Sequence, residues 1–285
     1  MKKSFWLLLL LVLVLVSFNF ITRAEEEFNI GVIPAQNQGK MQVAMDKLEI
    51  YLEDKLDKGV KIDVYPDYNG VVEAMNYNQV DMAFFGPLTY VIANHESGAQ
   101  AIVTQLIDGE PYYHSYFITH KSSSLNSFED VIERSGEIDF AFGDPNSTSG
   151  SLIPGIALRE AGLEPENDFE NMRYTGSHDA TALAIEYQQL DVGAIDSAIF
   201  NILAENGKID RDNFKIIWKS KKLFQYPWAV SKDTSEELIS KLRKAFYDIE
   251  DEDILDAFGA SDFVKAEDKD YLPIKKAAKK AGRIK

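Results

Sequence analysis

The sequence predicts an α/β fold, in which apolar strands alternate with amphipathic helices. Short runs rich in β-branched and aromatic residues, such as 28–33 and 82–85, are separated by segments with apolar residues at helical spacing, such as 41–56. Strands and helices that alternate in this way form parallel sheets covered by helices. About 260 residues follow a distinct N-terminal segment, which is enough for two modest domains.

Residues 1–24 have the layout of a secretory signal peptide. Two lysines precede the apolar run 5–18, and the small residues Thr22 and Ala24 stand before an acidic stretch. The run is shorter than the roughly 20 residues of a spanning helix, although retention as an anchor is an alternative. We therefore expect a signal peptide at 1–24 and a mature protein that is periplasmic or extracellular after cleavage.

The chain is strongly acidic. It has 30 Lys and Arg against 46 Asp and Glu, and loss of Lys2, Lys3 and Arg23 with the signal peptide leaves 27 basic residues and a net charge of −19. This charge disfavours nucleic acid and anionic membranes as partners. The chain has no cysteine, and its four histidines lack zinc-binding spacing, so we expect no cofactor and no metal.

The first half predicts a β-α-β series. Strands are expected at 28–33, 60–65, 82–85 and 101–107, and helices at 41–56, 70–77 and 88–94. Helix 41–56 places Leu48, Leu52 and Leu56 near one face. Pro87 stands at the first turn of helix 88–94, where its missing N–H costs nothing. A strand at 113–119 then runs into the polar segment 121–126, which predicts a domain crossover.

The second half repeats the pattern and then returns. Helices are expected at 127–134, from Ser149, at 177–190 and at 197–205, and strands at 139–142, 172–174, 192–195 and 214–218. Strand 228–230 and helix 235–247 are assigned to the first domain, and the basic tail 275–285 to a surface helix or frayed end. The expected lobes are 25–118 with 220–285, and 119–219.

A hydroxyl-rich turn, 144–150 (DPNSTSG), lies between a predicted strand and a predicted helix. The first N–H groups of a helix lack intrahelical partners and carry partial positive charge. Together with the hydroxyls of Ser147, Thr148 and Ser149 they suit an oxyanion such as phosphate. The alternative is an ordinary helix cap, for which serine and threonine are favoured.

Other polar side chains also stand at strand or helix ends. His178 lies at a predicted helix start, where partial positive charge favours neutral imidazole, and a surface histidine is the alternative. Tyr68 and Tyr113 each offer an apolar wall with one hydroxyl, although ordinary packing is the commoner role of a tyrosine. Asp196 ends a predicted strand, the position at which open α/β sheets bind ligands.

Common catalytic patterns are missing. The sequence contains no G-x-S-x-G, no Walker A pattern and no H-E-x-x-H. Residue types alone leave open a serine hydrolase that uses Ser147 or Ser149 with His178. The absence of any recognisable pattern around these residues nevertheless favours a protein that is not an enzyme.

Taken in order, these segments resemble those of the phosphate-, phosphite- and phosphonate-binding proteins of ABC importers. The similar segments are 66–74 (PDYNGVVEA), 80–87 (VDMAFFGP), 109–113 (GEPYY), 144–150 (DPNSTSG), 176–180 (GSHDA) and 190–197 (LDVGAIDS). The ordered set spans most of the mature sequence. The resemblance implies a two-lobed type II periplasmic binding protein. Each lobe is then a mixed, mostly parallel sheet covered by helices, two crossover strands join the lobes, and the ligand lies in the cleft.

The resemblance also implies individual roles, which agree with those that the residue types favour. The expected ligand-binding residues are Tyr68, Tyr113, Ser147, Thr148, Ser149, His178 and Asp196. The hydroxyls of the turn and His178 hold phosphoryl oxygens, the tyrosines form walls that also hydrogen-bond, and Asp196 accepts from a protonated ligand oxygen. Family members that take an aminoalkylphosphonate resemble this chain but carry carboxylates near the positions of Ala198 and Tyr226. This chain has no acid there, which favours phosphate, phosphite or a short alkylphosphonate.

The expected function is capture of a small phosphorus oxyanion outside the cytoplasm and delivery to the transmembrane subunits of an ABC permease. We expect a monomer with these partners and no nucleic-acid partner. Two alternatives share the fold. One is an extracellular sensor module that acts on a receptor kinase, and the other is an enzyme that turns over a phosphonate or ester.

Overall fold

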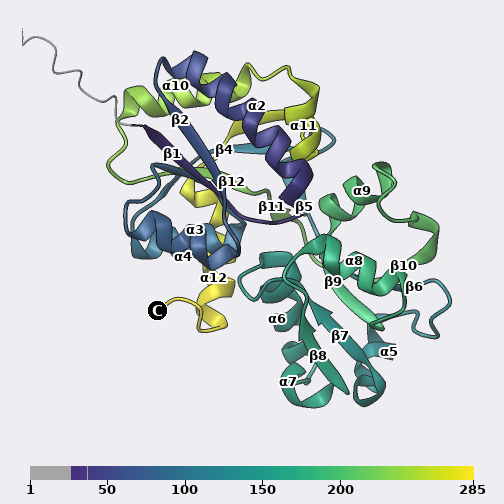
Figure 1. Cartoon of the computed structure of the whole chain (residues 1–285). Helices are drawn as coiled ribbons and strands as arrows, with labels where there is room; N and C mark the ends of the chain where they lie inside the picture. The colour runs from purple at the N-terminus through teal and green to yellow at the C-terminus, as the bar shows by residue number, and fades with distance from the viewer. Residues whose placement is uncertain (1–26, 37) are drawn as a thin grey trace, which may run out of the picture.

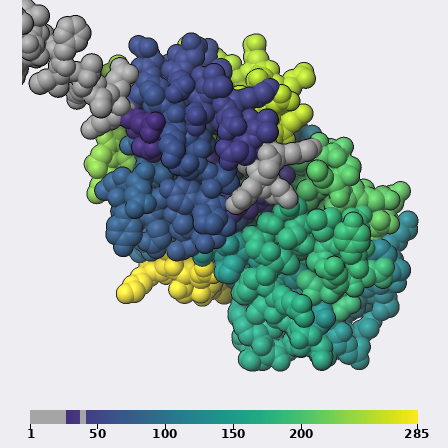
Figure 2. All heavy atoms as spheres, in the orientation of Figure 1, coloured from purple at the N-terminus to yellow at the C-terminus, as the bar shows by residue number. Residues whose placement is uncertain are grey.

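The computed structural model describes residues 27–36 and 38–285, so the expected signal peptide lies outside the described residues. The chain forms two bodies, each built on one mixed sheet, which we call lobe 1 and lobe 2 (Figure 1). The space-filling view shows the purple and blue residues of lobe 1 in contact with the teal and green residues of lobe 2 (Figure 2). Within the described ranges, every helix is too short or too polar to span a bilayer.

Lobe 1 contains a six-stranded sheet in the order β13-β4-β12-β3-β1-β2. Its strands are β1 (Phe28–Val32), β2 (Val60–Val64), β3 (Met82–Phe84), β4 (Gln100–Leu106), β12 (Pro227–Val230) and β13 (Asp262–Lys265). One face carries α2 (Gln38–Leu56), α10 (Glu236–Tyr247) and α11 (Glu252–Phe258), and the other α3 (Tyr68–Asn76), α4 (Pro87–Glu96) and α12 (Leu272–Lys280) (Figure 1). Buried apolar side chains from both faces form the core of this lobe.

Lobe 2 contains a five-stranded sheet in the order β10-β6-β9-β7-β8. Its strands are β6 (Ser115–His120), β7 (Asp139–Phe142), β8 (Asn171–Tyr174), β9 (Val192–Asp196) and β10 (Phe214–Lys219). Its helices are α5 (Phe128–Glu133), α6 (Ile153–Glu160), α7 (Pro165–Asp168), α8 (His178–Glu186) and α9 (Ser197–Glu205). Successive strand residues point to opposite faces. Phe140 accordingly packs in the cluster that includes α5 and α6, and Ala141 in the cluster that includes α8.

Two connecting segments join the lobes and pair with each other. β5 (Tyr112–Tyr113) and β11 (Leu223–Phe224) form a two-stranded antiparallel ribbon between the sheets. β6 pairs within the second sheet from Ser115 onward, so the expected boundary after residue 118 falls inside this strand. We propose that the chain enters lobe 2 at His114 and leaves it after Lys219, the last residue of β10.

The sheets are less parallel than expected. β1 pairs in parallel with β2 and β3, and β7 with β8 and β9. The remaining pairings, which involve β4, β6, β10, β12 and β13, are antiparallel. The segments that cross between lobes, together with β13, enter the sheets against the direction of the β-α-β strands. Mixed sheets are thus confirmed, whereas the expected predominance of parallel pairing is wrong.

Other expectations need correction at helix ends. An α-helix from Ser149 was expected, but Thr148–Leu152 (η3) is a π-helical turn, because the N–H of Leu152 donates to the carbonyl of Ser147. α8 ends at Glu186, well before residue 190, since Gln188 adopts a positive φ. Of the two alternatives for the tail, the structure has the surface helix and not the frayed end. α12 buries Ile274 and Ala278 against lobe 1, so the last residues are held in place.

Candidate ligand-binding site

Loops from both lobes meet between the two sheets. In lobe 1, β1 and β3 lead to Ala35 and Leu88, and in lobe 2, β7 and β8 lead to Thr148 and His178. The N–H of His178 donates to the carbonyl of Ala35 over 3.4 Å, and the N–H of Leu88 to Thr148 Oγ1 over 2.7 Å. The carboxyl ends of parallel strands from both lobes therefore face each other, as at the ligand sites of α/β sheets.

The hydroxyl turn is packed tightly against the end of β7. The N–H of Gly143 donates to the carbonyl of Gly150 over 2.8 Å, and a Cβ at Gly150 would lie 3.1 Å from Gly143 Cα and 3.2 Å from His178 Cε1. Ser147 Oγ accepts from the N–H of Gly150 over 2.9 Å, so the capping alternative holds for this serine. Thr148 Oγ1 likewise accepts a backbone N–H, which leaves both hydroxyl protons to donate elsewhere.

His178 is buried and neutral. It is 1% exposed, and burial lowers the pKa of its imidazole to about 3. The N–H of Asp196 points at His178 Nδ1 over 3.3 Å, and a backbone N–H can only donate, so the ring proton resides on Nε2. Nε2 lies 3.4 Å from Tyr226 Oη. The surface alternative is therefore wrong, and the ring presents the neutral N–H donor that its position predicted.

Asp196 ends β9 and caps α9. Its Oδ1 accepts from the N–H groups of Ala198 and Ile199 over 2.7 and 3.1 Å. Burial raises the pKa of this carboxyl to about 7, and the hydrogen bonds from the two N–H groups, which lower the pKa, only partly offset this effect. Near neutral pH the carboxyl therefore exchanges between its acid and its anion, and Oδ2 can either donate or accept a hydrogen bond.

Three tyrosines surround Asp196. Tyr68 opens α3, Tyr113 lies on β5, and Tyr226 precedes β12, and all three are buried. The ring centroids of Tyr113 and Tyr226 are 5.5 Å apart. Burial raises the pKa of each phenol well above its usual value, and the nearby carboxylate of Asp196 adds to the effect. The hydroxyls remain protonated and available as donors.

Several buried polar atoms at this place lack a hydrogen-bond partner among residues 27–36 and 38–285. They are Tyr113 Oη, Ser149 Oγ and Asp196 Oδ2. Buried polar atoms in folded proteins are nearly always paired, so unpaired ones need an explanation. The three atoms lie in one cluster between the two lobes, where their unused hydrogen-bonding capacity is available to a polar group from outside the chain.

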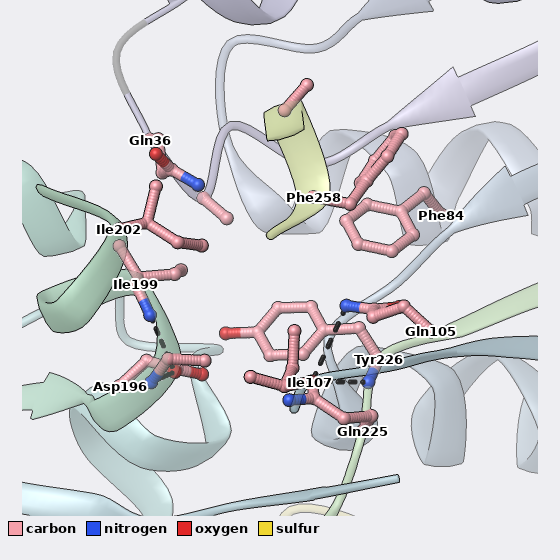
Figure 3. Close-up of a pocket in the computed structure, with 13 residues that line it drawn as sticks. Gln36, Phe84, Gln105, Ile107, Asp196, Ile199, Ile202, Gln225, Tyr226 and Phe258 are labelled. Atoms are coloured by element: carbon pink, nitrogen blue, oxygen red, sulfur yellow. Dashed lines mark hydrogen bonds between the residues drawn. The ribbon is translucent and has the colours of Figure 1, made fainter. Parts of the chain in front are cut away.

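A small pocket adjoins Asp196 and Tyr226 (Figure 3). Its internal volume is about 20 Å³, which holds roughly one water molecule. The walls are mostly apolar, and the exceptions include the side-chain amides of Gln105 and Gln225. The lining residues are Ala35, Gln36, Phe84, Gln105, Ile107, Asp196, Ala198, Ile199, Ile202, Gln225, Tyr226, Ala257 and Phe258.

The structure thus brings together all seven residues that the sequence singled out. Each is at most 2% exposed. Sequence reasoning missed three contributions: Tyr226 as a polar member of the site, the N–H of Leu88, and the buried pair Gln105 and Gln225. A glutamine inside the apolar strand 101–107 was a signal for the last of these. Within the described part of the chain, no group of three or more His, Asp or Glu side chains is arranged to hold a metal.

The family model described as "ABC transporter, phosphonate, periplasmic substrate-binding protein" matches residues 30–271. The chain belongs to this family. It is 30% identical to the phosphonates-binding periplasmic protein of Escherichia coli over 261 residues, which are 89% of this chain and 76% of that protein. It is 27% identical to a probable ABC-transporter phosphite-binding protein of Prochlorococcus marinus over 268 residues, 90% of each chain.

Solved structures of the family share the fold. The phosphonate-family protein PhnD1 of Prochlorococcus marinus, crystallised in complex with methylphosphonate, superposes with a TM-score of 0.82 at 27% identity, covering 91% of this chain and 99% of that chain. The two-lobed type II periplasmic binding fold is therefore confirmed. The protein is an extracytoplasmic substrate-binding component of an ABC importer and not an enzyme, with a small-molecule ligand and permease subunits as its partners.

Proposed function

We propose that this protein binds a small phosphorus oxyanion, phosphate, phosphite or a short alkylphosphonate, between its lobes. The observation that carries the proposal is the buried cluster of neutral donors around Tyr113 Oη, Ser149 Oγ and Asp196 Oδ2, which are unpaired within the described residues. Relatives named for phosphonates and phosphite support the same ligand class. In this proposal Ser147, Thr148 and His178 also donate to ligand oxygens, and Tyr68 and Tyr113 form the walls.

The carboxyl of Asp196 determines whether the complex holds a proton between the protein and the ligand. With a pKa raised to about 7, its carboxyl shares one proton with a ligand oxygen, either as its own O–H or as an acceptor from a P–O–H group. A fully ionised anion such as sulfate brings no proton. At high pH its negative oxygens would therefore lie against the negative carboxylate of Asp196, which is unfavourable. The site therefore favours phosphorus oxyanions, which keep an exchangeable proton, over sulfate.

The surroundings of Asp196 disfavour an aminated ligand. Ala198 and Tyr226 border the adjoining pocket, and neither offers a carboxylate to an ammonium group. A buried ammonium without a charged partner is costly. We propose that 2-aminoethylphosphonate binds more weakly than methylphosphonate or phosphite.

The import role sets further expectations. We propose that residues 1–24 are removed as a signal peptide, and that the mature protein works as a monomer without a nucleic-acid partner. The two lobes meet at the site, because the N–H of Leu88 in lobe 1 donates to Thr148 Oγ1 in lobe 2, and the carbonyl of Ala35 in lobe 1 accepts from the N–H of His178 in lobe 2. A ligand that pairs with groups from both lobes stabilises the closed form, which is the form that a permease can recognise.

The decisive experiment is isothermal titration of the protein from Glu25 onward with phosphate, phosphite, methylphosphonate, 2-aminoethylphosphonate and sulfate. We expect micromolar or tighter binding of at least one of the first three, and its loss in a Thr148→Ala, His178→Ala double variant. The matched control is a Ser122→Ala, His120→Ala variant, which also removes one hydroxyl and one imidazole, but at the end of β6 and the turn after it, away from the site. The proposal would be contradicted if none of the five compounds bound, or if 2-aminoethylphosphonate bound most tightly.

A further inference from the structure

Two glutamines are buried beside the proposed anion site. Gln105 lies on β4 and Gln225 directly precedes Tyr226, and they are 4% and 1% exposed. Both side-chain amides border the pocket that adjoins Asp196 (Figure 3). A buried amide is costly unless its donors and acceptors are paired. The hydrogen bonds of this pair therefore bear on what the pocket accepts.

The orientation of both amides follows from one backbone group. The N–H of Tyr226 points at Gln225 Oε1 over 3.3 Å, and because a backbone N–H only donates, the atom that it faces is the oxygen. That oxygen also faces Gln105 Nε2 over 3.4 Å, which must be the donor. Gln105 Oε1 and Gln225 Nε2 remain, and neither has a partner within residues 27–36 and 38–285. The pair therefore offers one acceptor and one donor.

A hydroxyl group matches this pair, because it donates to Gln105 Oε1 and accepts from Gln225 Nε2. A methyl group can do neither, and leaves both amides unpaired or facing a trapped water. An ammonium group has no lone pair for Gln225 Nε2, and a carboxylate has no proton for Gln105 Oε1. The volume of about 20 Å³ suits one group the size of a water molecule.

The side chain of Tyr226 lies between Asp196 and the two amides (Figure 3). In Figure 3 the phenol oxygen of Tyr226 points toward Asp196, while the other end of its side chain lies beside the two amides. The apolar side chains of Phe84, Ile199 and Phe258 also line the pocket. A phosphonyl group at Asp196 would therefore direct a substituent of one or two carbons along the Tyr226 ring toward the amides, and the side chains around the pocket would have to move apart to admit it, since the space now holds about one water molecule.

We infer that the ligands of this protein include short phosphonates that carry a terminal hydroxyl, and that Gln105 and Gln225 recognise this hydroxyl. The inference rests on the proposed function, since it requires the phosphonyl group at Asp196. It adds a polar specificity element to a pocket whose walls are mostly apolar. Gln105 and Gln225 act here as specificity-determining residues toward the ligand's substituent.

The test compares hydroxymethylphosphonate and 2-hydroxyethylphosphonate with methylphosphonate, ethylphosphonate and phosphite by isothermal titration on the protein from Glu25 onward. We expect one hydroxylated ligand to bind at least about tenfold tighter than its alkyl counterpart. The reason is that its hydroxyl forms hydrogen bonds with the two buried amides, which the alkyl ligand leaves without partners. Gln105→Met keeps the side-chain length and removes the free acceptor, and should abolish this ratio. Gln100→Met, on the same strand outside the pocket, should leave the ratio intact.

The possible results distinguish failure of the hydroxyl inference from failure of the proposed function. Equal or weaker binding of both hydroxylated ligands, with phosphite or methylphosphonate still bound, overturns the inference and leaves the proposed function standing. A hydroxyl preference that survives Gln105→Met also overturns it, because the recognition then lies elsewhere. Failure of every phosphorus compound to bind, in a protein with an intact unfolding transition, refutes the proposed function itself.

Discussion

Replacement of Asp196 by asparagine tests the account of the buried carboxyl. The amide oxygen can keep the hydrogen bonds from the N–H groups of Ala198 and Ile199, so α9 keeps its cap. The variant loses only the titrating proton and the charge. Any pH-dependent difference in stability between the two proteins then reports on this carboxyl.

The direction and size of the effect follow from the pKa. Burial raises the pKa of Asp196 to about 7 in the folded protein, against about 3.9 in the unfolded chain. The folded state therefore holds the proton to higher pH, and the stability contributed by the group is complete below about pH 4 and lost as the pH rises to 7. Three pKa units correspond to about 4 kcal/mol. This is an upper limit, because opening of the lobes hydrates the carboxyl.

The assay is urea unfolding of wild type and Asp196→Asn at pH 4.5, 6, 7 and 8 without ligand. The unfolding free energy of the variant minus that of wild type should rise by between about 1 and 4 kcal/mol from the lowest to the highest pH. Taking the difference cancels other titrating groups. Asp191→Asn, at the exposed residue directly before β9, reports the effect of removing one charge from this acidic chain. A difference that stays constant across the range, or falls, refutes the assignment of a raised pKa.

Other predictions concern the contacts between the lobes. Thr148→Val removes the acceptor of the Leu88 N–H, and titration should show ligand affinity at least about tenfold weaker; unchanged affinity would mean that this contact plays no part in closure. Gly150→Ala puts a Cβ within 3.1 Å of backbone and should lower the unfolding free energy by about 1–3 kcal/mol, whereas Gly136→Ala, with open space, serves as the tolerated control. Equal stability of these two variants would contradict the packing described. Arg283→Ala removes the guanidinium that donates to Pro145 and Asn146 of the hydroxyl-rich turn, and should speed ligand release in stopped-flow measurements by about three- to tenfold; an unchanged rate would mean that these bonds do not hold the turn in its ligand-binding form.

The sequence by itself determined the elements and most of the candidate site. Alternating strands and helices are properties of neighbouring residues, so periodicity located the longer helices and strands between 28 and 247, but not α7 or the two-residue strands β5 and β11. The hydroxyl turn, His178 and Asp196 could also be predicted, because each stands where a strand or helix end is visible in the local pattern. The residue types of the turn, His178 and Asp196 also show that these side chains can form hydrogen bonds.

Only the tertiary structure decided how these pieces meet. The bond from Leu88 to Thr148 joins residues 60 apart in sequence, and that between Gln105 and Gln225 joins residues 120 apart. The raised pKa of Asp196 likewise depends on burial by both lobes and the connection between them. Local propensity carries no information on such pairs, because burial and hydrogen bonding between distant residues arise only when the sheets pack. For this reason the ligand class could be predicted from the chain, whereas the specificity pocket emerged only from the packed lobes.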